Sequence, residues 1–535
     1  MKLVFSSRLC NRQDTDREKQ IMVIRKVCGL VLMALVATGA LALAEEAELA
    51  DAVEAQQHHL IRSLLDEGQG LNVTQVDGMA AIHWAAYHDD VETTRLLIDA
   101  GANIGVANRY GVTPLSLAAE NGNGALIEAL LEAGADPKAV LRGGETVLMT
   151  ASRTGGLEGV KALLAKGADP NAVEARHQTA LMWAAAEGHA DIVQELVDAG
   201  ADVDARLGSG YTSIFFAARE GHMTAIQVLL AAGVDVNGGL ERPKEGSATF
   251  IENPRDKPID DGMSPLLLAV RNGHFEVALE LVEAGADPND MRTGFTPLHT
   301  VSWVRKPDAS DTGDPAPVGS GNVTSLEFVS EMVSLGADIN AVLAPETGRP
   351  PHTASRLARE GSTPFLMAAD RADAALMQTL VDLGADPLLA NAELSTPLMA
   401  AAGLGTTAPL EEAGTELDAQ QAVQLLLGLG ADIDAVDSNG ETSMHGATYA
   451  HFPSIVNLLS DHGADIEVWT RQNERGLTPL FIAEGHRGGG FKPSRPTIDA
   501  VMALMLGAGA STDGPRPRIR DIYEKKPEPP AGGIR

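Results

Sequence analysis

The chain has 535 residues, with 41 Lys and Arg against 73 Asp and Glu, so its formal net charge at pH 7 is −32. Binding to nucleic acid requires a basic surface that neutralises phosphates, so this charge argues against a nucleic-acid partner. Aromatic residues make up only 4% of the sequence, which also disfavours a platform for stacking bases. Two cysteines are too few for a disulfide framework or for a zinc site with several cysteine ligands.

The N-terminal segment has the composition of an export signal. Residues 22–44 begin with a short basic stretch at Arg25 and Lys26, continue as an apolar run and end in small residues. This order is typical of a secretory signal peptide. We expect residues 1–21 to be an upstream extension, with translation starting at Met22.

The alternative for this segment is an uncleaved membrane anchor over residues 27–44, because about 18 apolar residues can just span a bilayer. In both cases the basic residues stay inside, so the bulk of the chain is expected outside the cytoplasm. It would be periplasmic in a Gram-negative source and secreted otherwise. Both cysteines, Cys10 and Cys28, lie in this leader, so the exported chain would have no disulfide and no thiol nucleophile.

Residues 45–76 carry apolar residues at helical spacing, including Leu49, Val53, Ile61 and Leu64. They lack the Thr-Pro motif that follows them. We expect a degenerate capping repeat with a more polar outer face.

Residues 77–514 repeat one unit: Gly-x-Thr-Pro-Leu-x-x-Ala-Ala, an apolar helix, and then Gly-Ala-Asp. The first five units follow each other at a spacing of 33 residues, and eleven units can be counted. The threonine position is occupied by Ala80, Thr113, Thr146, Thr179, Thr212, Ser264, Thr296, Thr363, Thr396, Thr442 and Thr478. The closing glycines are Gly101, Gly134, Gly167, Gly200, Gly233, Gly285, Gly336, Gly384, Gly430, Gly463 and Gly509.

Each unit predicts a pair of helices. Residues 181–187 form an Ala-rich first helix, and residues 191–199 form a second helix with one apolar stripe. Thr followed by Pro is a helix start, and glycine at the end of the second helix suits a left-handed C-terminal residue. One helix pair cannot bury its apolar face alone, so neighbouring pairs must stack.

The period and the motif resemble the ankyrin-repeat family, whose signature is T-P-L-H-x-A. Residues 296–299 copy the first four letters, and residues 187–193 copy the turn and second helix. The resemblance implies an all-α repeat solenoid of stacked helix-turn-helix repeats with β-hairpin finger loops. It also implies hydrogen-bonding structural roles for His83 and His299 in the motif, and for the Gly-His turns at 189, 222 and 274.

Five insertions interrupt the period, near residues 239–260, 304–322, 343–360, 404–417 and 485–497. The first and third fall between successive repeats, and the other three fall between the two helices of one repeat. They are rich in Pro, Gly and charge, which cannot build a core. They are either tolerated surface loops or partner-specific contacts.

Candidate protein-binding residues come from two places. Exposed finger positions are expected at Tyr110, Gln178, Tyr211 and Phe295, which ankyrin proteins use to contact partners. The start of one insertion adds Trp303, Arg305 and Lys306, and Trp and Arg are enriched at binding hot spots. Trp303 could equally cover the helix ends beneath it.

Catalysis is not expected. The sequence has no Gly-x-Ser-x-Gly, no His-Glu-x-x-His and no phosphate-cradling glycine loop in a strand–helix context. The histidines are explained by repeat position or lack ligand spacing, so neither a metal site nor a cofactor is expected. The tail at residues 515–535 is rich in Pro and basic residues and is expected to be disordered.

The leader holds seven of the 41 Lys and Arg and three of the 73 Asp and Glu, so residues 45–535 carry 34 basic and 70 acidic residues. We therefore expect a non-catalytic scaffold outside the cytoplasm that binds a protein through its concave face and inserted loops. The acidic body favours a partner with a basic patch. The alternatives are an accessory or protective subunit of an exported enzyme, and a secreted effector that binds host proteins.

Overall fold

A computed structural model describes residues 47–68, 70–240, 262–307, 315–345, 355–409, 413–486 and 492–513. The predicted extension (1–21), signal peptide (22–44) and tail (515–535) lie outside these residues, as does most of the predicted insertion at 239–260. The chain divides into two units: residues 1–184 with 191–202, and residues 185–190 with 203–535.

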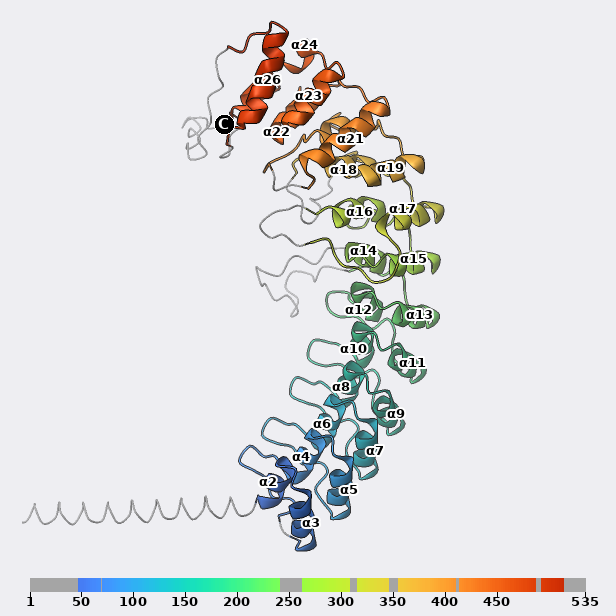
Figure 1. The fold of residues 1–535 in the computed structure, drawn as a ribbon. Coiled ribbons are helices and arrows are strands. Elements are labelled where there is room, and N and C mark those ends of the chain that lie inside the picture. The colour runs from blue at the N-terminus through green and yellow to red at the C-terminus, as the bar shows by residue number, and fades with distance from the viewer. Residues whose placement is uncertain are drawn as a thin grey trace, which may run out of the picture. The chain divides into compact units, whose positions relative to one another are not determined.

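The regular elements of the described residues are helices, which come in pairs apart from the short α24 (Figure 1). In the first unit and at its boundary the helices are α2 (Glu48–Glu54), α3 (His58–Asp66), α4 (Ala81–Tyr87), α5 (Val91–Asp99), α6 (Pro114–Glu120), α7 (Gly124–Glu132), α8 (Val147–Thr154), α9 (Leu157–Ala165), α10 (Ala180–Glu187) and α11 (Ala190–Asp198). In the second unit they are α12 (Ser213–Glu220), α13 (Met223–Ala231), α14 (Pro265–Arg271), α15 (Phe275–Glu283), α16 (Pro297–Arg305), α17 (Ser325–Ser334), α18 (Pro364–Asp370), α19 (Ala374–Asp382), α20 (Pro397–Ala401), α21 (Glu416–Gly428), α22 (Ser443–Tyr449), α23 (Pro453–Asp461), α24 (Ile466–Trp469), α25 (Pro479–Ala483) and α26 (Arg495–Gly507).

The repeat threonine and the closing glycine set the ends of the helices. Thr146 lies in extended backbone before α8, and its Oγ1 accepts a hydrogen bond from the Met149 amide at 3.2 Å. This bond satisfies one of the donors that a helix start leaves open. After α7, Gly134 has a φ of 97°, and its amide donates to the Leu131 carbonyl. Glycine adopts this left-handed conformation at no steric cost, so it ends the helix cleanly.

The core is a row of equivalent side chains, one from each repeat. In the first unit, first helices pack on first helices, as α4 does on α6, and second helices pack on second helices, as α7 does on α9. Leucines 33 residues apart in the second helices are completely buried, namely Leu97, Leu130, Leu163 and Leu196. Each leucine is buried by neighbouring repeats, so a repeat depends on its neighbours for stability. The all-α repeat solenoid expected from the sequence is confirmed within each unit.

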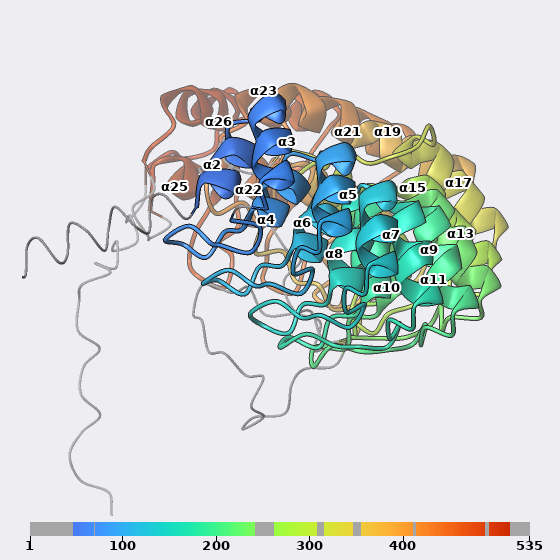
Figure 2. The same cartoon turned by 90° about the horizontal axis from the view of Figure 1, so that it is seen from below.

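The fingers that join successive repeats are loops that project beside the helices (Figure 2). No strand occurs in the described ranges, and the only β features there are isolated bridges, Thr74 to Ala80 and Val140 to Thr146. In one finger the Asn108 amide donates to the Val112 carbonyl, and the Asn108 Oδ1 accepts the amides of Tyr110 and Val112. The expected β-hairpins are thus shorter than expected, because a side chain takes over part of the pairing.

At the other end of several repeats, an Asn or Asp side chain connects the repeat to the next one. Asn171 donates from Nδ2 to the Gly200 carbonyl at 2.9 Å and accepts the Asp202 amide at 2.7 Å. Asn289 makes the same two bonds to Gly336 and Asp338. We call this row of side chains the amide ladder. It explains the Gly-Ala-Asp motif, because the glycine carbonyl and the aspartate amide are the groups that the ladder binds.

The insertions leave the amide ladder intact. Asn237 reaches Gly285 and Asp287 across the insertion near 239–260. The described part of the insertion near 304–322 lies back on earlier repeats, where Ser320 Oγ donates to the Gly221 carbonyl and bonds His274 Nδ1. Parts of the insertions near 404–417 and 485–497 form the first turns of α21 and α26, which have 13 residues each.

Candidate protein-binding surface

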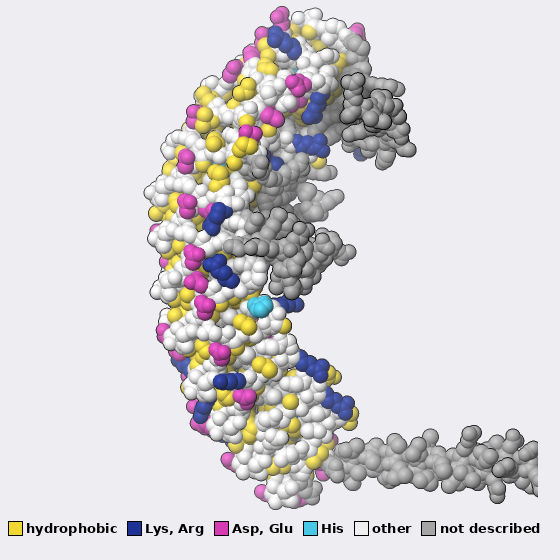
Figure 3. All heavy atoms as spheres, turned by 180° about the vertical axis from the view of Figure 1, so that it is seen from behind, with side chains coloured by type: hydrophobic (Ala, Val, Ile, Leu, Met, Phe, Trp, Pro, Cys, Tyr) yellow, Lys and Arg dark blue, Asp and Glu magenta, His cyan; other side chains and the backbone are white. Residues whose placement is uncertain are grey.

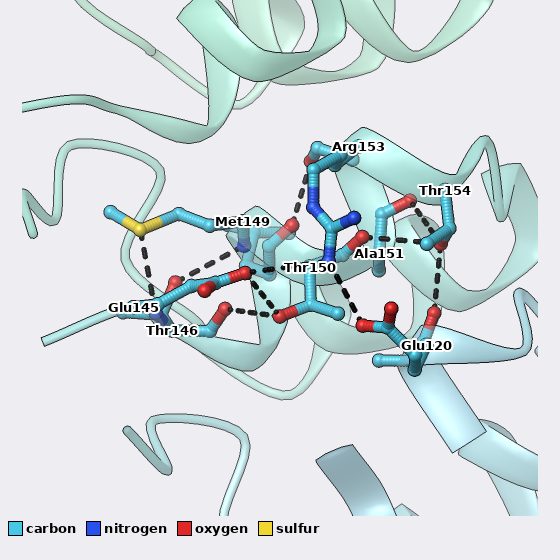
Figure 4. Close-up of polar contacts among 11 residues, drawn as sticks. Glu120, Glu145, Thr146, Met149, Thr150, Ala151, Arg153 and Thr154 are labelled. Atoms are coloured by element: carbon cyan, nitrogen blue, oxygen red, sulfur yellow. Dashed lines mark hydrogen bonds and ion pairs between the residues drawn. The ribbon is translucent and has the colours of Figure 1, made fainter. Parts of the chain in front are cut away.

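The fingers and the first helices of the repeats form one continuous surface in each unit, which we call the finger face. Within a finger, the residue just before the repeat threonine turns toward its own first helix. Glu145 shows this in the first unit (Figure 4): its Oε1 accepts a hydrogen bond from Thr150 Oγ1 at 2.9 Å and lies 3.8 Å from the Arg153 Nη2. The first helix thus holds this side chain, and the finger tip is free to project.

Arg153 is the centre of a polar cluster on the finger face of the first unit. Its Nη2 lies 2.9 Å from the Glu120 Oε2, on the preceding first helix (Figure 4). Its guanidinium carbon lies 5.9 Å from the centre of the Trp183 ring, which is cation–π distance. The Arg153 side chain is 33% exposed, so the cluster combines a charge and an aromatic ring at an accessible place.

The same repeat position is apolar and buried in one repeat of the second unit. Phe295 precedes Thr296, and its ring meets the Trp303 ring edge-on with 5.0 Å between the centroids. Phe295 is 5% exposed and Trp303 is 6% exposed. The exposure predicted for Phe295 is therefore wrong, because the ring turns toward α16. For Trp303, the structure favours the covering role over the exposed one.

A third repeat uses the same position for a hydrogen-bonded carboxylate. Glu441 precedes Thr442, and its Oε1 accepts hydrogen bonds from the Tyr449 hydroxyl at 2.6 Å and the Asn473 Nδ2 at 2.7 Å. Burial raises the pKa of Glu441, and the Tyr449 and Asn473 hydrogen bonds partly offset that rise.

The remaining finger candidates differ in exposure. Gln178 and Tyr211 also precede the repeat threonine and are half-buried, and the Tyr211 ring lies 5.4 Å from Phe215 and 5.5 Å from Phe216. Tyr110 occupies the finger tip and is 65% exposed. Of the four predicted finger residues, Tyr110 therefore presents the largest fraction of its side chain.

The charged candidates near the insertion make contacts inside the second unit. Arg305 Nε lies 2.8 Å from Asp373 Oδ2, in a pair where Asp373 is 2% exposed. Lys306 Nζ lies 3.2 Å from Asp418 Oδ1 and donates to the Ala372 carbonyl. These bonds tie the end of α16 to α19 and α21, so the charged groups of Arg305 and Lys306 are used in packing.

Three arginines at finger tips were not predicted from the sequence. Arg109, Arg142 and Arg176 are exposed, and all three belong to the first unit. Aligning the fingers on the repeat threonine would have found them, because Arg109 and Arg142 stand four residues before it and Arg176 stands three before it. Three of the four predicted finger residues, Gln178, Tyr211 and Phe295, instead occupy the position directly before the threonine.

The second unit also contains a polar cavity of about 310 Å³. Its walls include three carboxylates, two arginines and the Tyr449 ring, and the carboxylates are Glu393, Asp437 and Glu441. Asp437 already accepts the Asn439 and Glu441 amides, and Glu393 accepts the Asn439 Nδ2. The cavity is therefore polar, of mixed charge and largely hydrogen-bonded within the protein.

The motif histidines serve the fold. His299 is completely buried, with Nδ1 2.7 Å from the Thr296 Oγ1 and Nε2 3.1 Å from the Ser362 carbonyl. Burial lowers the pKa of His299 to about 4. His445 occupies the same repeat position, and its pKa is likewise lowered by burial to about 4. Both rings are therefore neutral at pH 7.

In the part of the chain that the structure describes, no three His, Cys, Asp or Glu side chains come together as a metal site would require. Across the same residues, no helix has the length and apolar character needed to cross a bilayer. The possible anchor at 27–44 lies outside the described residues.

Comparison with known proteins identifies the repeats. A family model described as ankyrin repeats in three copies matches residues 49–140 and 148–238, and an ankyrin-repeat model matches residues 261–292. Ankyrin repeat and SOCS box protein 6 from Homo sapiens is 30% identical over 114 residues, which cover 19% of this chain and 27% of that protein. The Pongo abelii protein of the same name matches to the same extent. The chain thus spans about a quarter of the length of these relatives.

The matched residues include the α2–α3 pair and the finger tips at Arg109, Tyr110 and Arg176. Ankyrin repeats are modules of protein–protein interaction and are generally non-catalytic, and no enzyme family is indicated. The chain therefore contains ankyrin-repeat domains, which imply a scaffold for protein–protein interaction.

Proposed function

We propose that this chain is a non-catalytic scaffold that works outside the cytoplasm and holds a partner protein on its finger face. The observation that carries the proposal is the rigid presentation of exposed side chains by linked fingers. The Arg109 amide donates to the Asp77 carbonyl, and the Ala175 amide donates to the Gly143 carbonyl, each across two fingers. A preorganised surface of this kind binds without ordering a loop first.

The location rests on residues 22–44, whose basic, apolar and small-residue order is that of a signal peptide. Export would place the protein in the periplasm of a Gram-negative source, and in the medium otherwise. Cell fractionation and mapping of the mature N-terminus test this part. A mature protein that starts upstream of Met22 in the cytosolic fraction would contradict it.

The partner is best sought by crosslinking in the native compartment followed by mass spectrometry. We expect crosslinks to one protein that map to the fingers, and binding that weakens with salt because the chain is strongly charged. Crosslinks confined to the second helices would argue against the finger face. A partner that proves to be an exported enzyme, and whose activity changes with binding, would narrow the function to that of an accessory subunit.

A further inference from the structure

In an acidic chain, three finger tips of the first unit are basic. We infer that these tips form a docking edge for an acidic, extended peptide segment of a partner protein. We call this surface the basic edge and define it as Arg109, Tyr110, Arg142, Arg176 and His177, all of them exposed. The inference rests on the proposed scaffold function and adds the chemistry of the partner.

The three guanidinium groups of the basic edge have no acidic partner among the described residues. Within the basic edge, the only hydrogen bond that a guanidinium makes is donated by Arg142 Nη2 to the Arg109 carbonyl at 3.0 Å. This bond holds one finger tip against the next. In Figure 3, basic side chains project from the finger edge of the first unit. The three charges therefore remain available to carboxylates from outside.

Carboxylates in the fingers of the first unit turn toward their own chain. Asp77 accepts the Met79 amide at 3.0 Å. Glu174 Oε1 accepts the amides of Arg176 at 2.8 Å and Gln178 at 3.1 Å. A carboxylate that accepts strong hydrogen bonds from backbone amides is held in place, so these acids shape the fingers. The arginines, in contrast, point outward.

The backbone at His177 supplies an independent observation. His177 stands where the other fingers of the first unit have Gly78, Gly111 and Gly144, and it keeps their left-handed conformation with a φ of 66°. A side chain in this conformation costs free energy, and such strain is concentrated at functional positions. Here the strained residue places an imidazole beside Arg176 on the exposed tip.

Apolar side chains border the basic edge and restrict the kind of ligand. Val140 and Val173 hold equivalent positions in neighbouring fingers and are 60% and 52% exposed. An extended peptide with acidic and apolar residues could use both features, since its side chains alternate between two directions. A polyphosphate chain has no apolar side chains, so it would leave Val140 and Val173 without a partner.

The test uses the full-length protein and three fluorescein-labelled probes: a decapeptide of alternating Glu and Leu, its Gln analogue, and a single-stranded DNA 20-mer. We expect the Glu peptide to bind, with an affinity that falls in high salt. The variant Arg109→Ala/Arg142→Ala/Arg176→Ala should weaken binding roughly tenfold, as expected for three exposed ion pairs.

The matched control is Arg95→Ala/Lys138→Ala/Lys166→Ala, which removes three exposed positive charges of the same unit away from the finger tips. It should leave the affinity for the Glu peptide within about twofold, because the edge is intact. Circular dichroism of both variants checks that the helices persist. Equal losses in the two variants, equal binding of the Gln analogue, or tighter binding of DNA would each overturn the inference. If crosslinking captures a partner but the Glu peptide fails to bind, the scaffold stands and the basic edge alone falls.

Discussion

One pair of repeat positions has opposite chemistry in two repeats, one from each unit. In the first unit, Glu145 before the threonine and Arg153 on the first helix form a partly exposed polar pair. In the second unit, Phe295 and Trp303 occupy the same positions as a buried aromatic pair. The backbone geometry is the same, so the repeat fixes which side chains meet, and the residue types decide whether the contact stabilises the fold or faces a partner.

Replacing the helix member of each pair should separate the two roles. We expect Trp303→Ala to lower the stability of the second unit by about 3–5 kcal/mol, because it removes a buried ring and leaves Phe295 unpacked. Arg153→Ala should cost at most about 1 kcal/mol, because exposed ion pairs contribute little. Hydrogen exchange of peptides covering α16 and α8 reports each region separately. Similar losses at both sites would break the comparison.

The second prediction concerns acid sensitivity in the same helix. Folding lowers the pKa of His299 from 6.5 to about 4, so the unfolded chain binds a proton in this range that the folded chain does not. Stability should therefore fall as the pH drops from about 6.5 toward 4, with His299 contributing roughly 3 kcal/mol in total. Urea midpoints measured across this range test it.

The control for acid sensitivity is the slope of stability against pH. The variant His299→Gln is expected to be less stable at pH 7, but its slope between pH 6 and 4.5 should be shallower by about 1.4 kcal/mol per unit. Parallel slopes for the variant and the native chain would show that the buried imidazole is not responsible.

The smallest effect is expected at Tyr449. Its hydroxyl donates to Glu441, so Tyr449→Phe removes one hydrogen bond and should cost about 1 kcal/mol. The loss should also raise the pKa of Glu441 further, because the Tyr449 hydrogen bond favours the ionised form. NMR titration of the Glu441 carboxyl measures this shift. An unchanged or lower pKa would mean that the hydroxyl does not stabilise the charge.

The helix pairs could be predicted because the residues that define them act locally. Thr146 caps α8 by accepting the amide three residues further on, and Gly134 lies in the turn just after α7. The surface could be predicted only in part, because exposure depends on contacts within the folded repeat. The sequence predicts exposed aromatic residues in fingers at both Phe295 and Tyr110. Only Phe295, which lies next to the repeat threonine, turns inward.

The contacts around the insertions could not be predicted at all. The bond between Arg305 and Asp373 joins residues 68 positions apart, and no local pattern relates them. The basic edge was missed for a different reason. The overall negative charge of the chain predicts a basic partner, but the three tip arginines form a small region of opposite sign.

The amide ladder has a consequence for how such a chain can change length. Each linked repeat carries both halves of the junction: an Asn side chain that binds the next repeat, and a glycine carbonyl and aspartate amide that are bound by the previous one. A duplicated repeat would therefore bring a complete connector at both ends and would require no new interface. The same property lets Asn237 bind the next repeat across a long intervening segment. Whole repeats, and loops between them, can therefore be gained or lost without new contacts at the junctions.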